Sequence, residues 1–281
     1  MYPNLFHLPE WFPVLGGSPI TSFGVMMLAA FLVGGYVLKT GMVRQGRTAD
    51  QAWDLLFWAV IGGIVGSRLY YVLLNYDRLS ADPLGMIFSR GGMVWYGGFL
   101  LAAALVFRRI HKVGLPMGRT VDAAAPGLAI AYAVGRVGCF LVGDDYGRPT
   151  DSWVGIAFPD GKPPSTATNL STQFGVEIDP AMVEKYGEVL PVHPTQLYEV
   201  GISTLIFVVL WRLRDHRNRP GWLLALWVVL ASAERFLVEI FRAKDDRFFG
   251  LFTLAQVISI ILAAVGVAWM MKLRGAKAVR G

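Results

Sequence analysis

The chain has 281 residues, of which 54% are hydrophobic and 16% charged, and its mean hydropathy is +0.48. Soluble domains are seldom this apolar, so the composition excludes an ordinary soluble enzyme and indicates a protein that crosses a membrane several times. The net charge of +6 comes from short basic clusters and gives no reason to expect a nucleic-acid partner. The single cysteine, Cys139, excludes an internal disulfide and a cysteine-based metal cluster.

Seven apolar runs are each close to the length that a helix needs to cross a bilayer, about 20 residues for ~30 Å of hydrocarbon. The runs do not alternate polar and apolar residues with a period of two, so helices are favoured over strands. We therefore predict an all-α membrane protein with seven transmembrane helices. The predicted spans are residues 20–38, 53–75, 92–107, 120–142, 196–211, 221–241 and 251–271.

The loops between these spans differ in charge, and the difference sets the expected orientation. Lysine and arginine gather in four segments that fall on one side of the membrane, and basic loops stay on the cytoplasmic side. The four segments are residues 39–47, 108–119, 212–219 and 272–280. We therefore expect a periplasmic N-terminal segment (1–19), helices one to four (20–142), a periplasmic head (143–195), helices five to seven (196–271) and a cytoplasmic tail (272–281).

Two segments are expected to lie outside the membrane on the periplasmic side. Residues 1–19 have no basic stretch followed by an apolar core, so we do not expect a cleavable signal peptide there. Residues 143–195 are rich in Gly, Pro, Asp, Ser and Thr, with strand-like stretches such as 153–158. The head is too small to be an independent enzyme domain, so we interpret it as a cap over the helices.

Polar residues inside the second and third spans are the first candidates for a site, because ionisable groups at membrane depth are expensive and often functional. Arg68 begins a face that continues with Tyr71 and Asn75. The segment GGMVWYGG (91–98) places Tyr96, whose hydroxyl can donate or accept a proton, before a glycine pair. That pair, Gly97 and Gly98, permits close backbone approach or a break in the helix. An ordinary interfacial aromatic pair is an equally good interpretation of Trp95 and Tyr96.

The segment GRVGCFLVGDDYGRPT (135–150) is the most informative part of the chain. It places Arg136 at the end of an apolar run and follows it with Asp144 and Asp145 among turn-forming glycines. A permanent cation at the edge of hydrocarbon requires an anion, and a phospholipid headgroup is the natural one. A snorkelling arginine is the structural alternative, and it weakens because other spans repeat the pattern. We interpret Cys139 as a small apolar filler.

The fifth and sixth spans carry further charges. In HPTQLYE (193–199), Thr195 is expected to cap the helix, whereas Glu199 lies inside the span and has no simple structural explanation. In ERFLVEIFR (234–242), Arg235, Glu239 and Arg242 share one helical face. The preceding Glu234 is turned about 100° away from that face.

These segments together resemble the bacterial prolipoprotein diacylglyceryl transferase family over about residues 21–263. The matching segments occur in the family's order. They are SFGVMM (22–27), GSRLYYVLLNY (66–76), GGMVWYGG, GRVGCFLVGDDYGRPT, HPTQLYE and RFLVEIFR (235–242). The resemblance implies seven transmembrane helices with a periplasmic head in the bacterial inner membrane.

The resemblance also implies a reaction. Family members move the diacylglyceryl group of phosphatidylglycerol onto the thiol of the lipobox cysteine of a preprolipoprotein, forming a thioether and releasing glycerol-1-phosphate. The implied partners are therefore phosphatidylglycerol and lipobox signal peptides, with no metal or nucleotide cofactor. The sequence agrees with this in lacking metal-ligand spacing or a phosphate-binding glycine loop.

The residues discussed above and the resemblance together give a set of site residues, of which the resemblance itself carries Arg136, Asp144, Gly147, Arg235 and Glu239. The catalytic candidates are Arg136, Arg235, Tyr96, Glu239 and Asp144. The substrate-binding candidates are Arg68, Gly97, Gly98, Gly147, Glu199 and Arg242. The chain departs from the family where Tyr96 replaces a frequent histidine, Cys139 and Val142 replace asparagines, and Phe23 replaces a tyrosine. These changes leave the phosphate-binding arginines in place and leave the identity of the proton acceptor open.

Two other functions fit part of the pattern. A transporter of an anionic solute would also carry intramembrane arginines and broken helices, but the sequence shows no internal repeat. A homologue that binds lipid without catalysis is suggested by the changes at residues 96, 139 and 142. Product formation from labelled phosphatidylglycerol and a cysteine-bearing signal peptide separates these functions from the transferase.

Overall fold

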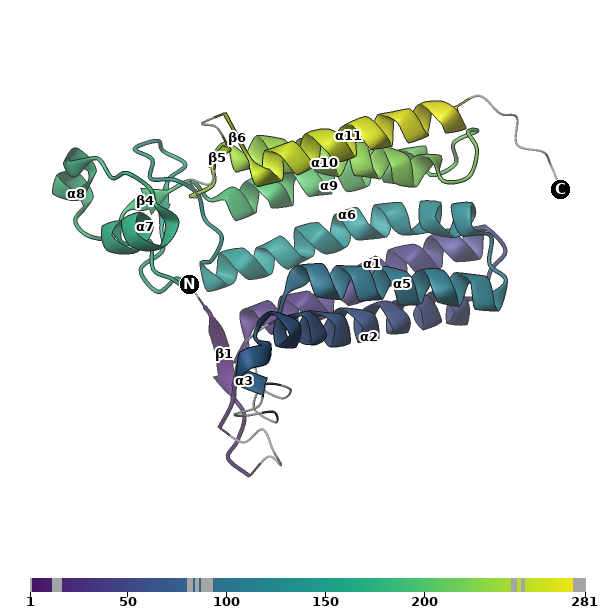
Figure 1. Cartoon of the computed structure of the whole chain (residues 1–281), viewed down its shortest axis with the longest axis horizontal. Helices are drawn as coiled ribbons and strands as arrows, with labels where there is room; N and C mark the ends of the chain where they lie inside the picture. Colours follow the sequence, from purple (N-terminus) through teal and green to yellow (C-terminus); the bar gives the residue numbers. More distant parts are fainter. Residues whose placement is uncertain are drawn as a thin grey trace. The chain divides into compact units, whose positions relative to one another are not determined.

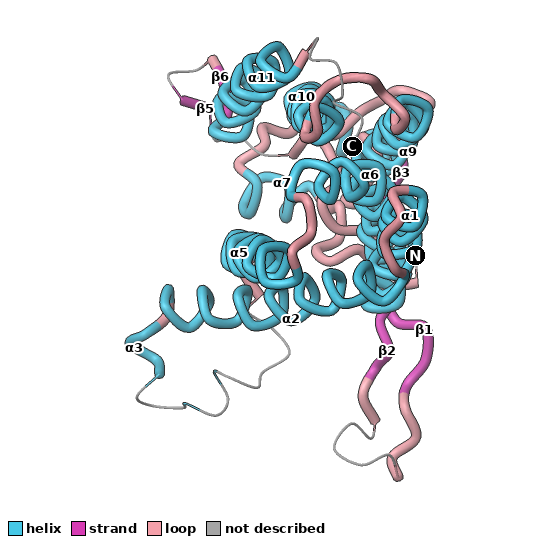
Figure 2. The backbone as a smooth tube through the Cα atoms, turned by 90° about the vertical axis from the view of Figure 1, so that its right-hand side faces the viewer, coloured by secondary structure: helices cyan, strands magenta, loops and turns pink. Residues whose placement is uncertain are grey.

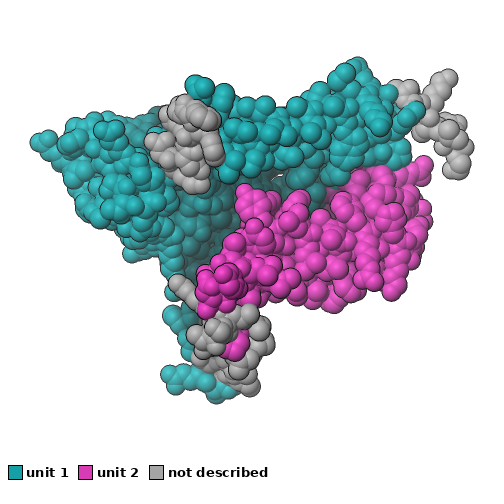
Figure 3. Space-filling view, in the orientation of Figure 1, with its two compact units in different colours: residues 1–34, 125–281 teal, residues 35–124 magenta. Residues whose placement is uncertain are grey.

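The computed structural model describes residues 2–11, 17–79, 83, 86, 93–243, 247–248 and 251–274. The chain forms two compact units (Figure 3): unit 1 comprises residues 1–34 and 125–281, and unit 2 comprises residues 35–124. Two long helices, α1 (Ser22–Arg44) and α6 (Met117–Val142), contribute residues to both units.

The described residues are mainly helical (Figure 1). Besides α1 and α6, the long helices are α2 (Ala49–Leu74), α5 (Trp95–Val113), α9 (Thr195–Leu213), α10 (Trp222–Glu239) and α11 (Leu254–Leu273). Short helices are α3 (Tyr76–Leu79), α7 (Ala167–Phe174) and α8 (Pro180–Tyr186). Three two-stranded antiparallel sheets pair β1 (Asn4–His7) with β2 (Pro19–Thr21), β3 (Ile156–Ala157) with β4 (Pro191–Val192), and β5 (Arg247–Phe248) with β6 (Phe252–Thr253).

Each predicted span overlaps one of the seven long helices of the described residues. Five of them, α1, α2, α6, α9 and α11, are long and apolar enough to cross a membrane. Helix α5 carries Arg108, Arg109 and Lys112 near its end, and α10 carries Glu234, Arg235 and Glu239, so both are more polar. A helical membrane protein is therefore confirmed, and the full set of seven spans stays a prediction. Residue 92 of the predicted third span, residues 1 and 12–16 of the predicted N-terminal segment and residues 275–281 of the predicted tail lie outside the described residues.

In unit 2, helices α2 and α5 pack side by side through glycines (Figure 2). A Cβ atom added to Gly62 would lie 2.5 Å from the Cα atom of Ala102, and the backbones at Gly66 and Gly97 are similarly close. Gly98 likewise faces α2, where a Cβ would meet the carbonyl of Gly63 at 2.8 Å. The close approach predicted for the glycine pair of α5 is therefore an approach to a neighbouring helix.

In unit 1, α10 packs against both α9 and α11 (Figure 1). A small apolar core joins α6 to α9 and α10, with Ala125, Ala129, Leu210 and Leu223 buried in it. The first half of α1 meets α6 where a Cβ on Gly127 would lie 2.8 Å from the carbonyl oxygen of Gly34. Ala131, one turn further along α6, lies at the same contact, 3.0 Å from a Cβ added to Gly34, whereas a Cβ on Gly135 would have nothing within 4 Å.

The head has its own core, which differs from the expectation of short strands. Phe158, Leu170, Leu190 and Val192 are fully buried there, and Tyr146 stacks on Phe158. Regular strand structure within 153–158 is limited to β3, whereas α7 and α8 were not predicted. These helices have 8 and 7 residues, too few for a clear hydrophobic period. Their local signals are the N-cap side chains of Thr166 and Asp179.

The glycine contact of unit 2 gives a testable prediction with a matched neighbour. Gly62→Ala places a methyl group against the backbone of Ala102, so we expect it to destabilise the protein by about 1–3 kcal/mol. Gly63→Ala adds the same group where nothing lies within 4 Å, so it should be neutral or stabilise α2 by up to ~1 kcal/mol. Thermal unfolding of the purified variants in detergent measures both changes, and equal effects would contradict the packing argument.

Candidate functional site

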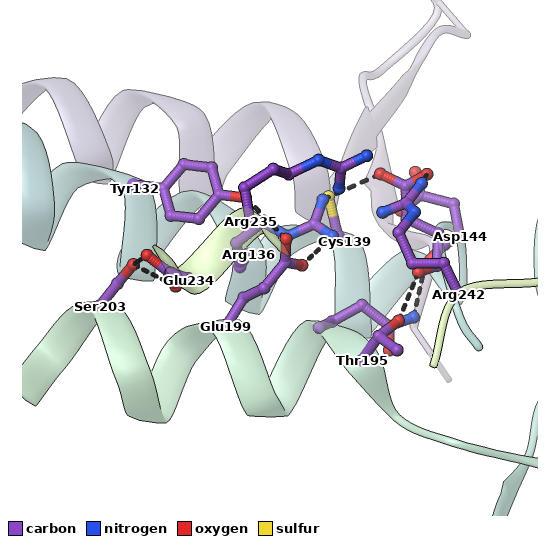
Figure 4. A network of polar contacts seen from close by, with 12 residues as sticks. Tyr132, Arg136, Cys139, Asp144, Thr195, Glu199, Ser203, Glu234, Arg235 and Arg242 are labelled. Atoms are coloured by element: carbon purple, nitrogen blue, oxygen red, sulfur yellow. Dashed lines mark hydrogen bonds and ion pairs between the residues drawn. The ribbon is translucent and has the colours of Figure 1, made fainter. Parts of the chain in front are cut away.

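A buried ion pair between α6 and α9 is the centre of the candidate site (Figure 4). The Nη2 atom of Arg136 pairs with the Oε2 atom of Glu199, and both residues are buried. The hydroxyl of Tyr132, one turn before Arg136, donates a hydrogen bond of 2.7 Å to the other oxygen of Glu199. Two residues that the sequence singled out separately, Arg136 and Glu199, are therefore direct partners.

A second group of charges lies at the end of α10. Arg235 Nη2 is 2.6 Å from Glu239 Oε2, and Arg242 Nε is 3.8 Å from the same oxygen. These contacts follow from the shared helical face predicted for the three residues. Glu239 is buried, so its charge has two arginine neighbours in place of water.

Asp145 connects the two groups. Its Oδ2 atom accepts a hydrogen bond of 2.8 Å from Arg136 Nη1, and its Oδ1 atom accepts one of 2.8 Å from Arg242 Nη2. The result is a continuous chain of alternating charges from Glu199 to Arg235. The sequence analysis assigned no role to Asp145. Its position beside Asp144 in an acidic pair is the only feature of the sequence that indicates one.

The turn that carries Asp145 is held by the first residues of α9. The Thr195 hydroxyl donates a hydrogen bond of 2.7 Å to the carbonyl of Asp145, and the Gln196 amide donates to the carbonyl of Asp144. The expectation that Thr195 caps α9 is therefore wrong: the helix starts after Pro194 without a side-chain cap. The Thr195 hydroxyl is already used by the turn.

The pKa values of the two aspartates in this turn are shifted in opposite directions. Burial, with the neighbouring Asp145 carboxylate, raises the pKa of the Asp144 carboxyl to about 6. Partial loss of hydration would also raise the pKa of Asp145, but Arg242 and Arg136 outweigh it and lower that pKa to about 2. Asp145 is thus a permanent anion near neutral pH, and Asp144 is the carboxylate better suited to exchange a proton.

The Cys139 thiol belongs to the same network, which corrects its interpretation as an apolar filler. Arg136 Nη1 lies 3.4 Å from its sulfur, and the thiol also hydrogen-bonds to Asp144. The sulfur and the carboxylates of Asp144 and Asp145 come within 4.8 Å of one another, a spacing that a metal ion also requires. Both oxygens of the Asp145 carboxylate already accept hydrogen bonds from arginines. These residues therefore fit an anion-binding site better than a cation site.

A further buried acid lies beside this network. Ser203 of α9 lies 2.6 and 2.7 Å from the two carboxylate oxygens of Glu234 (Figure 4). The sequence placed Glu234 away from the face of Arg235 and Glu239, and its contact with α9 agrees with that placement. Neither Ser203 nor Glu234 was predicted as a site residue.

The other predicted site residues belong to both units, and Gly147 of unit 1 forms an isolated β-bridge with Arg242 of the network. Gly147 is in unit 1, next to Phe241 and His193, where a Cβ would lie 2.8 Å from the His193 Cβ. Arg68 and Tyr96 belong to unit 2. Arg68 Nη1 donates to the carbonyl of Met86 at 3.2 Å, and Tyr96 is 57% exposed. Gly97 and Gly98, also in unit 2, contact α2.

The fold and this network define a helical membrane protein with a buried arginine–carboxylate site. The chain belongs to the prolipoprotein diacylglyceryl transferase family, whose model matches residues 9–272. The phosphatidylglycerol–prolipoprotein diacylglyceryl transferase of Chlorobaculum tepidum is 30% identical, covering 93% of this chain and 90% of its own. The enzymes of the same name from Gloeobacter violaceus and Bordetella bronchiseptica are 31% and 30% identical, covering 91% and 93% of this chain and 90% and 95% of their own.

The raised pKa of Asp144 predicts that removing its charge increases the stability of the fold, and that the increase depends on pH. A carboxyl whose pKa is higher in the folded protein destabilises the fold once it ionises, so stability is lost as pH rises from about 4 to about 6. Asp144→Asn should therefore raise the melting temperature at pH 8 and change it little at pH 4. The difference between a pKa of about 4 in the unfolded chain and about 6 in the folded protein corresponds to about 3 kcal/mol as an upper limit.

The neighbouring Asp145→Asn is the matched comparison for this pH experiment, since the low pKa of Asp145 means that its ionised form stabilises the fold. That contribution is present above about pH 4 and is lost as pH falls toward 2. Asp145→Asn should therefore lower the melting temperature at pH 8. Shifts of the same sign in both variants would contradict the assigned electrostatics.

Proposed function

We propose that the chain transfers the diacylglyceryl group of phosphatidylglycerol to the lipobox cysteine of preprolipoproteins and releases glycerol-1-phosphate. The proposal is supported by membership of the family and by the relatives' names. The structural observation that carries it is the connected set of Arg136, Arg235 and Arg242. Guanidinium groups bind phosphate oxygens in pairs, and they remain charged when buried.

We further propose that all seven long helices cross the bacterial inner membrane. In this topology the N-terminus and the head (143–195) are periplasmic, and the tail (272–281) is cytoplasmic. The distribution of basic residues supports this orientation. The polar character of α5 and α10 is compatible with spanning. The charges of α5 lie at its last turns, and in α10 Arg235 pairs with Glu239 while Glu234 has a hydrogen bond with Ser203. Lipid and the exported signal peptide would then meet at the periplasmic end of α6 and α9.

The proposed reaction breaks the bond between the glyceryl carbon and the phosphate oxygen, and the cysteine sulfur forms a bond to that carbon. Negative charge grows on the departing phosphate, and fixed cations lower the energy of that transition state. Arg136 and Arg235 are the proposed stabilising groups, and Arg242 of the same unit contributes to headgroup binding. Arg68 of unit 2 is proposed separately as a substrate-binding residue. The carboxylates of Glu199 and Glu239 keep the first two guanidiniums oriented before the lipid binds.

The attacking thiol, with an ordinary pKa of about 8.5, must lose its proton. Asp144 is the proposed acceptor in unit 1, because its carboxyl has a pKa of about 6, closer to neutral than that of an ordinary aspartate. Glu239 is the second candidate. Separately, we propose that the Tyr96 hydroxyl of unit 2 takes part in the proton transfer. Gly97 and Gly98 in unit 2, and Gly147 in unit 1, are each proposed to allow the close backbone packing that substrate binding requires.

Removing either phosphate-binding arginine tests the proposal. We expect Arg136→Ala and Arg235→Ala each to lower turnover by at least 10²–10³-fold, the usual cost of one lost charge-stabilising contact. The assay uses phosphatidylglycerol and a lipobox peptide and detects the thioether product. Arg212→Ala, at the other end of α9, is the control and should retain activity. Near-normal turnover in both site variants would exclude the proposed role of the two arginines. A wild-type protein that binds lipid but forms no thioether would be an inactive homologue.

Tyr96 is tested by two substitutions that differ in their ability to carry a proton. If its hydroxyl relays the thiol proton, Tyr96→Phe should lower the rate at pH 7, and Tyr96→His should retain or raise it. The comparison is made on kcat across pH 6–9. Full activity of the phenylalanine variant would show that the hydroxyl takes no part in the chemistry.

A further inference from the structure

The Asp145 carboxylate lies between two arginines and uses one oxygen for each. Its Oδ2 and Oδ1 atoms are both 2.8 Å from their partners, Arg136 Nη1 and Arg242 Nη2. A phosphodiester offers the same arrangement, two oxygens that share one negative charge. A carboxylate and a phosphodiester therefore compete for the same pair of guanidiniums.

Access to the two arginines depends on this carboxylate. The Arg136 side chain is 9% exposed and that of Arg242 is 16% exposed, whereas the Asp145 side chain between them is 44% exposed. Asp145 is thus the member of the group that faces outward. An incoming anion meets Asp145 before it can form a paired contact with both guanidiniums.

We propose that Asp145 is an internal competitor for the lipid phosphate, and that its displacement from Arg136 and Arg242 sets the apparent affinity for the anionic headgroup. The inference rests on the proposed function, since it assigns the two arginines to the headgroup. Lipid can bind only to the fraction of molecules in which the two arginines are free of Asp145. The apparent affinity is therefore the intrinsic affinity multiplied by that fraction.

The local structure permits the displacement as a movement of one side chain. The carbonyl of Asp145 accepts from Thr195, the carbonyl of Asp144 accepts from Gln196, and the backbone amide of Gly147 donates to His193. These bonds hold the backbone on both sides of the carboxylate. Asp145 has a left-handed backbone, φ +56°, and aspartate tolerates this better than most residues. Rotation about its side-chain bonds breaks two ion pairs and no backbone hydrogen bond.

The exchange also preserves the charge of the site. One carboxylate leaves and one singly charged phosphodiester enters, so no buried cation is left uncompensated. During the exchange Arg136 keeps its contact with Glu199, and Arg242 keeps its longer contact with Glu239. The arginines therefore need no new orientation to accept the phosphate.

Asp145→Asn is the direct test, because asparagine keeps the shape of the side chain and removes the competing charge. We expect the KM for phosphatidylglycerol to fall at least threefold with kcat within twofold of wild type. Inhibition by glycerol-1-phosphate should strengthen by a similar factor. Asp145→Glu retains a carboxylate and should keep the KM close to that of wild type.

A matched control separates competition at the site from a general change in charge. Asp151 is an exposed carboxylate of the head, paired with Lys185 at 2.6 Å. Asp151→Asn makes the same change in net charge away from the arginines, so it should leave the KM unchanged. An equal fall in KM in both variants would overturn the inference and indicate a non-specific electrostatic effect.

Lipid binding is measured in parallel, so that this inference and the proposed function can fail separately. The full chain in nanodiscs of phosphatidylcholine is titrated with labelled phosphatidylglycerol. Tighter binding by Asp145→Asn supports the competition even where no transfer occurs, and absent transfer counts against the proposed function alone. Unchanged or weaker binding, or a kcat more than tenfold lower at unchanged KM, would show that Asp145 positions the arginines. If the asparagine variant does not fold, Asp145→Ser is measured in the same assays with the same criteria.

Discussion

The ion pair between Arg136 and Glu199 is the interaction on which the rest of the site depends. Two charges removed from water are costly unless further partners complete their bonding. Here the completion comes from Tyr132 on one side and from Asp145 on the other. Each added partner comes from another part of the chain. The bonds that a buried Arg136 requires therefore hold α6, α9 and the end of α10 together.

The same interaction explains why polar residues are unevenly distributed along these helices. Through much of their length, α6, α9 and α10 meet through small and aliphatic side chains such as Ala129 and Leu210. Charges gather where α6 ends and α9 begins, next to a head with its own core. A site that must hold an anionic headgroup and a thiol benefits from this position, because aliphatic packing holds the helices while the polar end remains chemically adaptable.

The sequence predicted the general architecture well, because long apolar runs have few alternative structures. It also predicted the shared face of Arg235, Glu239 and Arg242, which follows from helical spacing alone. It did not predict the pairing of Arg136 with Glu199, since 63 residues separate them and no local pattern records such a contact. Asp145 and Thr195 were misjudged for a related reason: their roles arise where a loop meets a helix from another part of the chain. The short helices of the head were too brief for periodicity to reveal.

The attachment of the Asp144–Asp145 turn to the start of α9 has a consequence for how the family's sequences can vary in length. The turn is fixed at one end by α6 and along its backbone by Thr195, Gln196 and His193. One inserted or deleted residue moves the following chain by ~3.5 Å, which is more than these hydrogen bonds tolerate. Insertions and deletions among homologues should therefore be absent between residues 136 and 147 and should accumulate in the more distant parts of the head.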